Sequence, residues 1–185
     1  MQTFEIIHLI MILIGVCVAL GIGSYYLRRC INSKQSITLF WAIGFLSVGV
    51  GILTKVIIDL TNPSLEETFD YSRLFQGMGI FILVFMLVFS TFFIGLFDNK
   101  VNLIGTTITL LLASINIIYL SVTSFVYRDA IEINRYITIL MSLWSTGFFA
   151  YLGIKSKDWR ISLVSLGLIL SAIGGIFTVQ TKDTP

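Results

Sequence analysis

The distribution of apolar and charged positions is the clearest pattern in this chain. Predominantly apolar stretches of about 20 residues alternate with short segments that hold most of the charged residues. A helix rises 1.5 Å per residue, so about 20 residues cover the roughly 30 Å hydrocarbon core of a bilayer. The pattern predicts about six membrane-spanning helices, at residues 6–27, 36–60, 73–97, 101–127, 136–154 and 160–181.

The backbone requirement in lipid decides the fold class. Hydrocarbon offers no hydrogen-bond partner, so only helices and closed barrels cross it. The alternating apolar and polar residues of a membrane barrel are absent from this sequence. We therefore predict an all-α, polytopic membrane helix bundle, with residues 1–185 forming a single transmembrane domain.

The composition agrees with a chain whose main solvent is lipid. Charged residues make up 12% of the sequence and the mean hydropathy is +0.95, whereas a soluble domain has about 25% charged residues. The net charge of +2 comes from scattered Lys and Arg residues. Nucleic-acid binding requires clustered cations, so the predicted partner is the lipid bilayer and not a nucleic acid.

The Lys and Arg residues of the short loops predict the orientation, because cytoplasmic loops carry an excess of them. Seven of these residues fall on one side of the predicted bundle, namely Arg28, Arg29, Lys34, Lys100, Lys155, Lys157 and Arg160. The opposite side has Arg73, Arg128, Arg135 and Lys182, with Lys55 nearby. We therefore expect both termini outside, most simply at the plasma membrane.

Two short stretches resemble each other. The fragment at residues 41–45 reads WAIGF, and the fragment at 144–148 reads WSTGF, 103 residues later. Two weakly related three-helix halves would be inverted under the expected orientation, as in many transporters. Coincidence in a strongly biased composition is the alternative.

The predicted fourth and fifth spans have the most polar centres. Ser114 and Asn116 lie in the fourth span, and Ser142, Ser145 and Thr146 lie in the fifth. Transporters bind substrates near the bilayer midplane, so these residues are candidates for a substrate or ion path. The alternative is that they only form hydrogen bonds between helices. In either case we expect Asn116 to face the interior near the bilayer centre, opposite one of the three residues of the fifth span.

Lys55 is a charged residue within a predicted span. Ionisable groups in membrane spans often mark function, so Lys55 and Asp59, one helical turn later, are added to the candidate path. Lys55 also lies close enough to the outer boundary for its side chain to snorkel to the interface, with Asp59 as a neighbouring partner. Both interpretations remain open.

Small residues recur at every fourth position in three predicted spans. Such ridges let helix backbones approach closely in membranes. They predict packing within the chain, or contact with a second copy or with a partner membrane protein. The ridges are Gly15, Ala19 and Gly23, then Gly105, Thr109 and Ala113, and finally Gly167, Ser171 and Gly175.

The groups required for most enzyme chemistry are missing. The sequence has one His and two Cys, too few for clusters of several His or Cys ligands around zinc or haem. It has no His-Glu-x-x-His, Cys-x-x-Cys or Gly-x-Ser-x-Gly motif and no phosphate-binding glycine loop. We therefore expect no enzymatic activity, no metal and no cofactor for this chain alone.

Two functions remain at this point. The first is a small transporter or channel for a small solute or ion. The alternative is a membrane sensor or accessory subunit that docks a partner through its transmembrane helices. The fragment LFWAIGF at residues 39–45 resembles spans of multi-helix sensor modules in prokaryotic signalling proteins. This resemblance covers one helix of the predicted six and implies the sensor alternative.

Overall fold

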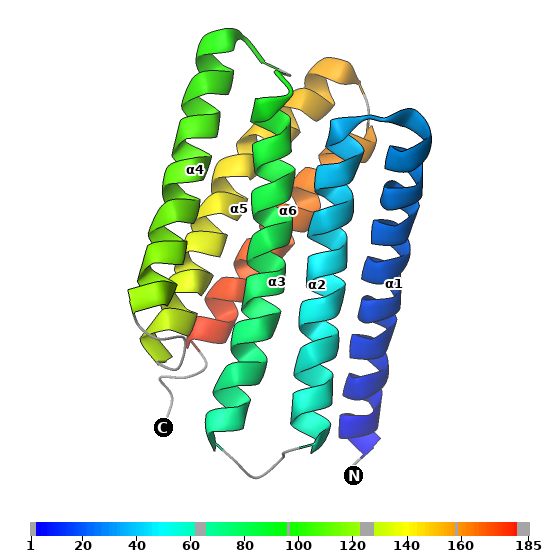
Figure 1. Cartoon of the computed structure of the whole chain (residues 1–185), viewed down its shortest axis with the longest axis vertical. Coiled ribbons are helices and arrows are strands. Elements are labelled where there is room, and N and C mark those ends of the chain that lie inside the picture. Colours follow the sequence, from blue (N-terminus) through cyan, green and yellow to red (C-terminus); the bar gives the residue numbers. More distant parts are fainter. Residues whose placement is uncertain (1–2, 62–65, 96, 123–127, 158, 181–185) are drawn as a thin grey trace.

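The computed structural model describes residues 3–61, 66–95, 97–122, 128–157 and 159–180. Over these ranges the chain forms helices and no strand, which confirms the all-α bundle. Neighbouring helices run in opposite directions (Figure 1). The helices are α1 (Thr3–Ser33), α2 (Ser36–Thr61), α3 (Glu66–Phe93), α4 (Asn99–Val122), α5 (Arg128–Ser156) and α6 (Trp159–Gln180).

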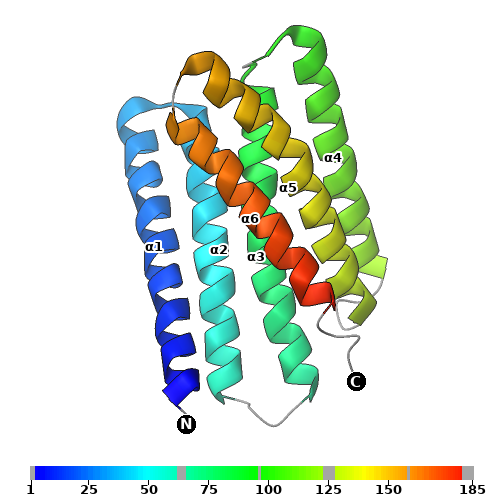
Figure 2. The same cartoon turned by 180° about the vertical axis from the view of Figure 1, so that it is seen from behind.

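In the part of the chain that the structure describes, five helices are long and apolar enough to cross a membrane, so the chain is an integral membrane protein. In α6, the apolar stretch among the described residues is the shorter segment Ile161–Leu170. Figure 2 shows that α6 runs obliquely across one face of the bundle. The five spans are Leu9–Ser33, Ser36–Ile58, Arg73–Phe93, Asn99–Val122 and Ile131–Ser156.

A residue with positive φ follows three of the helices, in the turn after each helix end. The three turns lie at the same end of the bundle, the upper end in Figure 1. Gly95 follows α3 with φ 78°, so this helix ends four residues before the predicted boundary at residue 97. Lys34 follows α1 with φ 53° and Lys157 follows α5 with φ 55°. The left-handed conformation costs an L-residue about 1–2 kcal/mol, so these two lysines occupy positions that favour glycine.

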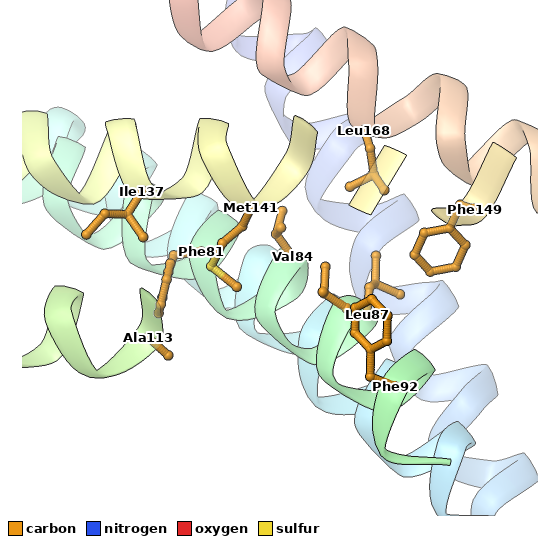
Figure 3. Packing of buried hydrophobic residues seen from close by; sticks show 10 residues of the cluster. Phe81, Val84, Leu87, Phe92, Ala113, Ile137, Met141, Phe149 and Leu168 are labelled. Carbon is orange, nitrogen blue, oxygen red and sulfur yellow. The ribbon is translucent and has the colours of Figure 1, made fainter. Parts of the chain in front are cut away.

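The core lies between α3 and α5. Helix α3 packs against α2, α4 and α5, and α5 also packs against α4 and α6. Helix α1 packs against α2 at one margin of the bundle, and α6 packs against α5 across one face of it (Figure 2). Figure 3 shows the buried side chains that meet in the centre, which include Phe81, Val84, Leu87, Phe92, Ala113, Ile137, Met141, Phe149 and Leu168.

Glycines allow the backbones of α2 and α3 to approach closely. A Cβ atom on Gly51 would lie 2.6 Å from the carbonyl oxygen of Phe75 and 3.2 Å from Cα of Gly79. A Cβ on Gly79 would in turn lie 2.7 Å from the carbonyl oxygen of Ser47. Neither glycine belongs to the small-residue ridges identified in the sequence, so the closest contact of these helices was missed there.

Candidate functional site

Helix α4 presents one polar face to the interior. Its buried residues follow one another at intervals of three or four positions, and such spacing places side chains on a single helix face. Ser114 falls outside this pattern and is exposed, so the structure places it away from the interior. The buried face comprises Asn102, Gly105, Thr109, Ala113, Asn116 and Leu120.

Asn116 faces the interior, as expected, but its partner is Asn134 of α5. Nδ2 of Asn116 donates a hydrogen bond to Oδ1 of Asn134 over 2.8 Å, and the two side chains are 0% and 1% exposed. The expected partner was Ser142, Ser145 or Thr146, and that expectation is wrong for this hydrogen bond.

The register of the antiparallel pair explains the partner. Asn116 lies six residues before the end of α4, and Asn134 lies six residues after the start of α5. Residues equally distant from the connection lie side by side in antiparallel helices. The pair is therefore about 9 Å from these helix ends, nearer the connection than the expected central position. Asn134 lies outside the fifth span predicted at residues 136–154, so the sequence analysis missed it.

Helix α3 closes the site behind Asn134. A Cβ on Gly77 would lie 2.9 Å from Nδ2 of Asn134, so the absence of a side chain at Gly77 makes room for this amide. On the other side of the pair, Oδ1 of Asn116 is buried and accepts no hydrogen bond from the described residues. The pair thus leaves a carbonyl-type acceptor unsatisfied in the interior.

Helix α5 continues the polar face. Asn134, Thr138, Met141 and Ser145 are all buried, and at 3.6 residues per turn they lie within a wedge of about 60°. We name five polar residues of these two buried helix faces the polar seam: Thr109, Asn116, Asn134, Thr138 and Ser145.

The hydroxyl groups of the polar seam donate to their own helices. Thr109 donates to the carbonyl oxygen of Gly105 over 2.7 Å, Thr138 to that of Asn134 over 2.6 Å, and Ser145 to that of Met141 over 2.8 Å. Each hydroxyl has a single proton, so these bonds leave oxygen lone pairs as the remaining hydrogen-bonding capacity. Together with Asn116 Oδ1, they make the polar seam rich in acceptors.

Ser142 and Thr146 lie next to the polar seam on α5. Thr146 is half-buried and donates to the carbonyl oxygen of Ser142 over 2.8 Å. The carbonyl oxygen of Thr146 accepts a hydrogen bond from Ser165 of α6 over 3.0 Å, so this part of α5 is turned toward α6. The hydroxyl of Ser142 is buried, and no described residue hydrogen-bonds to it.

Lys55 is separated from the polar seam. It is half-buried near the end of α2, and this helix packs against α1 and α3. Asp59 lies in the same helix, but its side chain is outside the described residues, as is any contact between the two. The structure therefore does not bring Lys55 to Asn116.

The small-residue ridges have different environments. Ala19 is buried, and a Cβ on Gly23 would lie 2.8 Å from Cγ of Leu46, so this part of the first ridge packs α1 against α2. Gly105 packs against the ring of Phe92 of α3. Gly15 and Gly167 are exposed and would bring a Cβ within 4 Å of nothing. The side chain of Ser171 and the surroundings of Gly175 are outside the described residues.

The two tryptophans of the similar fragments differ in environment. Nε1 of Trp41 donates to the hydroxyl of Ser90 over 3.1 Å, which links α2 to α3. Nε1 of Trp144 is buried without a partner in the part of the chain that the structure describes. The relation between the two halves therefore remains a prediction.

Asn102 is a further polar residue that the sequence analysis missed. It stands near the start of α4 and accepts a hydrogen bond at Oδ1 from the backbone N–H of Phe97 over 3.2 Å. Its Nδ2 donates to the carbonyl oxygen of Phe97. Both ends of this amide are used to close the connection between α3 and α4, so Asn102 has a structural role and Asn116 is the incompletely bonded asparagine of the same face.

Comparison of the chain with family models, with curated proteins and with solved structures finds no match. Among the described residues, no three His, Cys, Asp or Glu side chains gather to hold a metal ion. The structure thus defines a multi-pass, α-helical integral membrane protein with a buried polar seam between two helices.

Proposed function

We propose that this protein is a small, non-enzymatic transporter or channel whose path for a small solute or ion follows the polar seam. The observation that carries this proposal is the buried Oδ1 of Asn116, which has no hydrogen-bond partner among the described residues. A buried polar atom without a partner costs about 1–3 kcal/mol. A passing solute that donates a hydrogen bond would recover this cost.

The chemistry of the polar seam fits such a role. Transport through a membrane requires groups that replace the hydration shell of the solute, and protein oxygen atoms serve this purpose in channels. The polar seam supplies the oxygens of Thr109, Thr138 and Ser145 in addition to Asn116. It has no charged side chain among its five members, so a bound solute would be held by dipoles.

The test uses purified protein reconstituted into vesicles. Entry of small cations, anions and neutral polar solutes is followed by light scattering and by ion-selective dyes. Asn116→Leu should abolish the flux found for the wild-type protein. The matched control is Thr107→Val on the exposed face of the same helix, where the hydroxyl donates only to the carbonyl oxygen of Leu103. This control should keep the flux.

The free energy of unfolding, measured beside the flux, distinguishes a role of Asn116 in the transport path from a purely structural role. Hydrogen bonds between membrane helices contribute roughly 0.6–2 kcal/mol, so Asn116→Leu should lower the free energy of unfolding by about 1 kcal/mol and leave the protein folded. Loss of flux in a folded Asn116→Leu protein supports the proposal. Unchanged flux in that variant would restrict Asn116 to helix packing and contradict the proposal.

A second candidate function is that of a membrane sensor or accessory subunit that docks a partner membrane protein through its transmembrane helices. It is favoured by α1, which packs against α2 at the margin of the bundle and leaves Gly15 and Gly21 exposed with no atom near a Cβ position. Native mass in a mild detergent distinguishes the two. A stoichiometric partner that is lost in Gly15→Leu or in Gly21→Leu favours the subunit. A monomer or symmetric oligomer with flux favours transport.

The remaining parts of the proposal concern location and chemistry. We place the protein in the plasma membrane with both termini outside, because the end of the bundle with more Lys and Arg residues should face the cytoplasm. The chain is proposed to act without catalysis, metal or cofactor, since its single His and two Cys offer few ligands.

A further inference from the structure

One end of the bundle carries a set of exposed cations. It is the end where α1 and α5 terminate and α4 begins, the upper end in Figure 1. None of these side chains forms an ion pair with another residue in the ranges that the structure describes. We name as the basic end the residues Arg28, Arg29, Lys34, Lys100, Lys155 and Lys157, all of them exposed.

At the opposite end of the bundle, charged residues do interact with other residues of the chain. Lys55, Arg73, Glu132 and Arg135 lie near the other ends of their helices, and each has an interaction partner within the chain. Among described acidic side chains, the basic end has only the exposed Asp98. Among the described residues, the positive charge of the basic end is therefore not neutralised by ion pairs.

Exposed aromatic rings accompany these cations. Tyr25 is 60% exposed and lies one helical turn before Arg28 and Arg29, and Trp159 is 67% exposed at the start of α6. Nζ of Lys155 lies 5.7 Å from the ring centroid of Tyr151. Exposed Tyr and Trp rings prefer the headgroup region of a bilayer, and this preference would put the cations beside them at the level of lipid phosphates.

Two lysines of the basic end occupy backbone positions that disfavour them. Lys34 and Lys157 have φ values of 53° and 55°, and glycine or asparagine is the usual residue there. Their amides close the helix ends, with Lys34 N donating to Cys30 O over 2.8 Å and Lys157 N to Ile154 O over 3.4 Å. Glycine would form the same bonds with less strain, so the backbone does not explain the lysine side chains.

We propose that the basic end binds the headgroups of anionic phospholipids, with Lys34 and Lys157 as the principal contacts. The complementarity of charge and the aromatic belt favour this partner. The proposal is independent of the transport path, because none of the six cations belongs to the polar seam. The favourable effect of a cation at a helix C-terminus is the competing explanation, and it does not depend on lipid charge.

The experiment measures binding of phosphatidylglycerol and of phosphatidylcholine to the full chain by lipid titration in nanodiscs and by native mass spectrometry. Wild-type protein should prefer phosphatidylglycerol. In the double variant Lys34→Gly, Lys157→Gly this preference should fall about fivefold for each lysine, and the Tm in pure phosphatidylcholine should be equal or higher because strain is removed. Lys34→Arg with Lys157→Arg is the matched control and should keep the preference.

Three results would overturn the proposal. If wild-type protein showed no preference for phosphatidylglycerol, the proposed lipid site would not exist. An undiminished preference in the glycine variant would place the lipid elsewhere. Loss of the preference in the arginine control would show that something other than positive charge is responsible. In the second of these results, a lower Tm of the glycine variant in phosphatidylcholine would assign the two lysines to the helix-terminus explanation.

Discussion

The contact of α2 with α3 at Gly51 offers a quantitative test of the packing. In Gly51→Ala the added methyl group would lie 2.6 Å from the carbonyl oxygen of Phe75. Close contacts between carbon and oxygen are about 3.3 Å or longer, so the helices would have to separate by roughly 0.7 Å, the difference between the two distances. The obstacle is a backbone oxygen, which cannot move to another rotamer.

Two opposing terms decide the size of the effect. Replacing glycine by alanine in a helix interior is intrinsically favourable by about 0.5–1 kcal/mol, whereas overpacking a well-packed contact costs about 1–3 kcal/mol. Gly147→Ala in α5 is the matched control, because a Cβ there meets no atom within 4 Å. The control has the intrinsic term alone, so it should be at least as stable as the wild-type protein.

The free energies of unfolding of the two variants are compared in mixed micelles with an increasing fraction of a denaturing detergent, followed by circular dichroism. Gly51→Ala should be less stable than Gly147→Ala by about 1–3 kcal/mol. Equal free energies would show that α2 and α3 do not approach each other at Gly51, and the reasoning from glycine packing would be refuted.

Two further predictions concern orientation and composition. In a variant without the native cysteines, a cysteine at Glu132 should react with a reagent that cannot cross the membrane, and a cysteine at Lys34 should not. The reverse labelling would invert the orientation and leave the spans unchanged. Elemental analysis of the purified protein should find no stoichiometric metal, because the sequence has one His and two Cys, and a transition metal in equal amount would contradict the composition argument.

Five of the predicted spans match helices of the described residues that are long and apolar enough to cross a membrane, because bilayer thickness sets their length. The sixth predicted span, at residues 160–181, contains the shorter apolar segment Ile161–Leu170. The inward position of Asn116 could also be predicted, since an amide exposed to hydrocarbon has no partner. Its actual partner, Asn134, depends on the register of α4 and α5, which composition does not determine. Ser114 was placed in the candidate path by its proximity to Asn116 in sequence, although two residues along a helix point about 160° apart.

Glycine packing shows the same limit. The four-residue spacing identified Gly23 and Gly105, which do pack against other helices. It missed Gly51 and Gly79, which belong to no such series, because each is matched to a residue of the facing helix and not to a neighbour in its own. Contacts of this kind are a property of a helix pair, and the sequence of a single helix does not contain them.

The order of helix contacts has a consequence for biosynthesis. Successive helices pack against each other, and in the described residues α3 also packs against α5, which is not its neighbour in sequence. Each helix can therefore pack against the preceding helix as the chain is synthesised and inserted. The face of α3 that contacts α5 stays uncovered until α5 has been inserted. That face is formed by Phe81, Val84 and Leu87. In water an uncovered apolar face of this kind would promote aggregation. Lipid tails are as apolar as these side chains, so the face can remain exposed to lipid in the nascent chain.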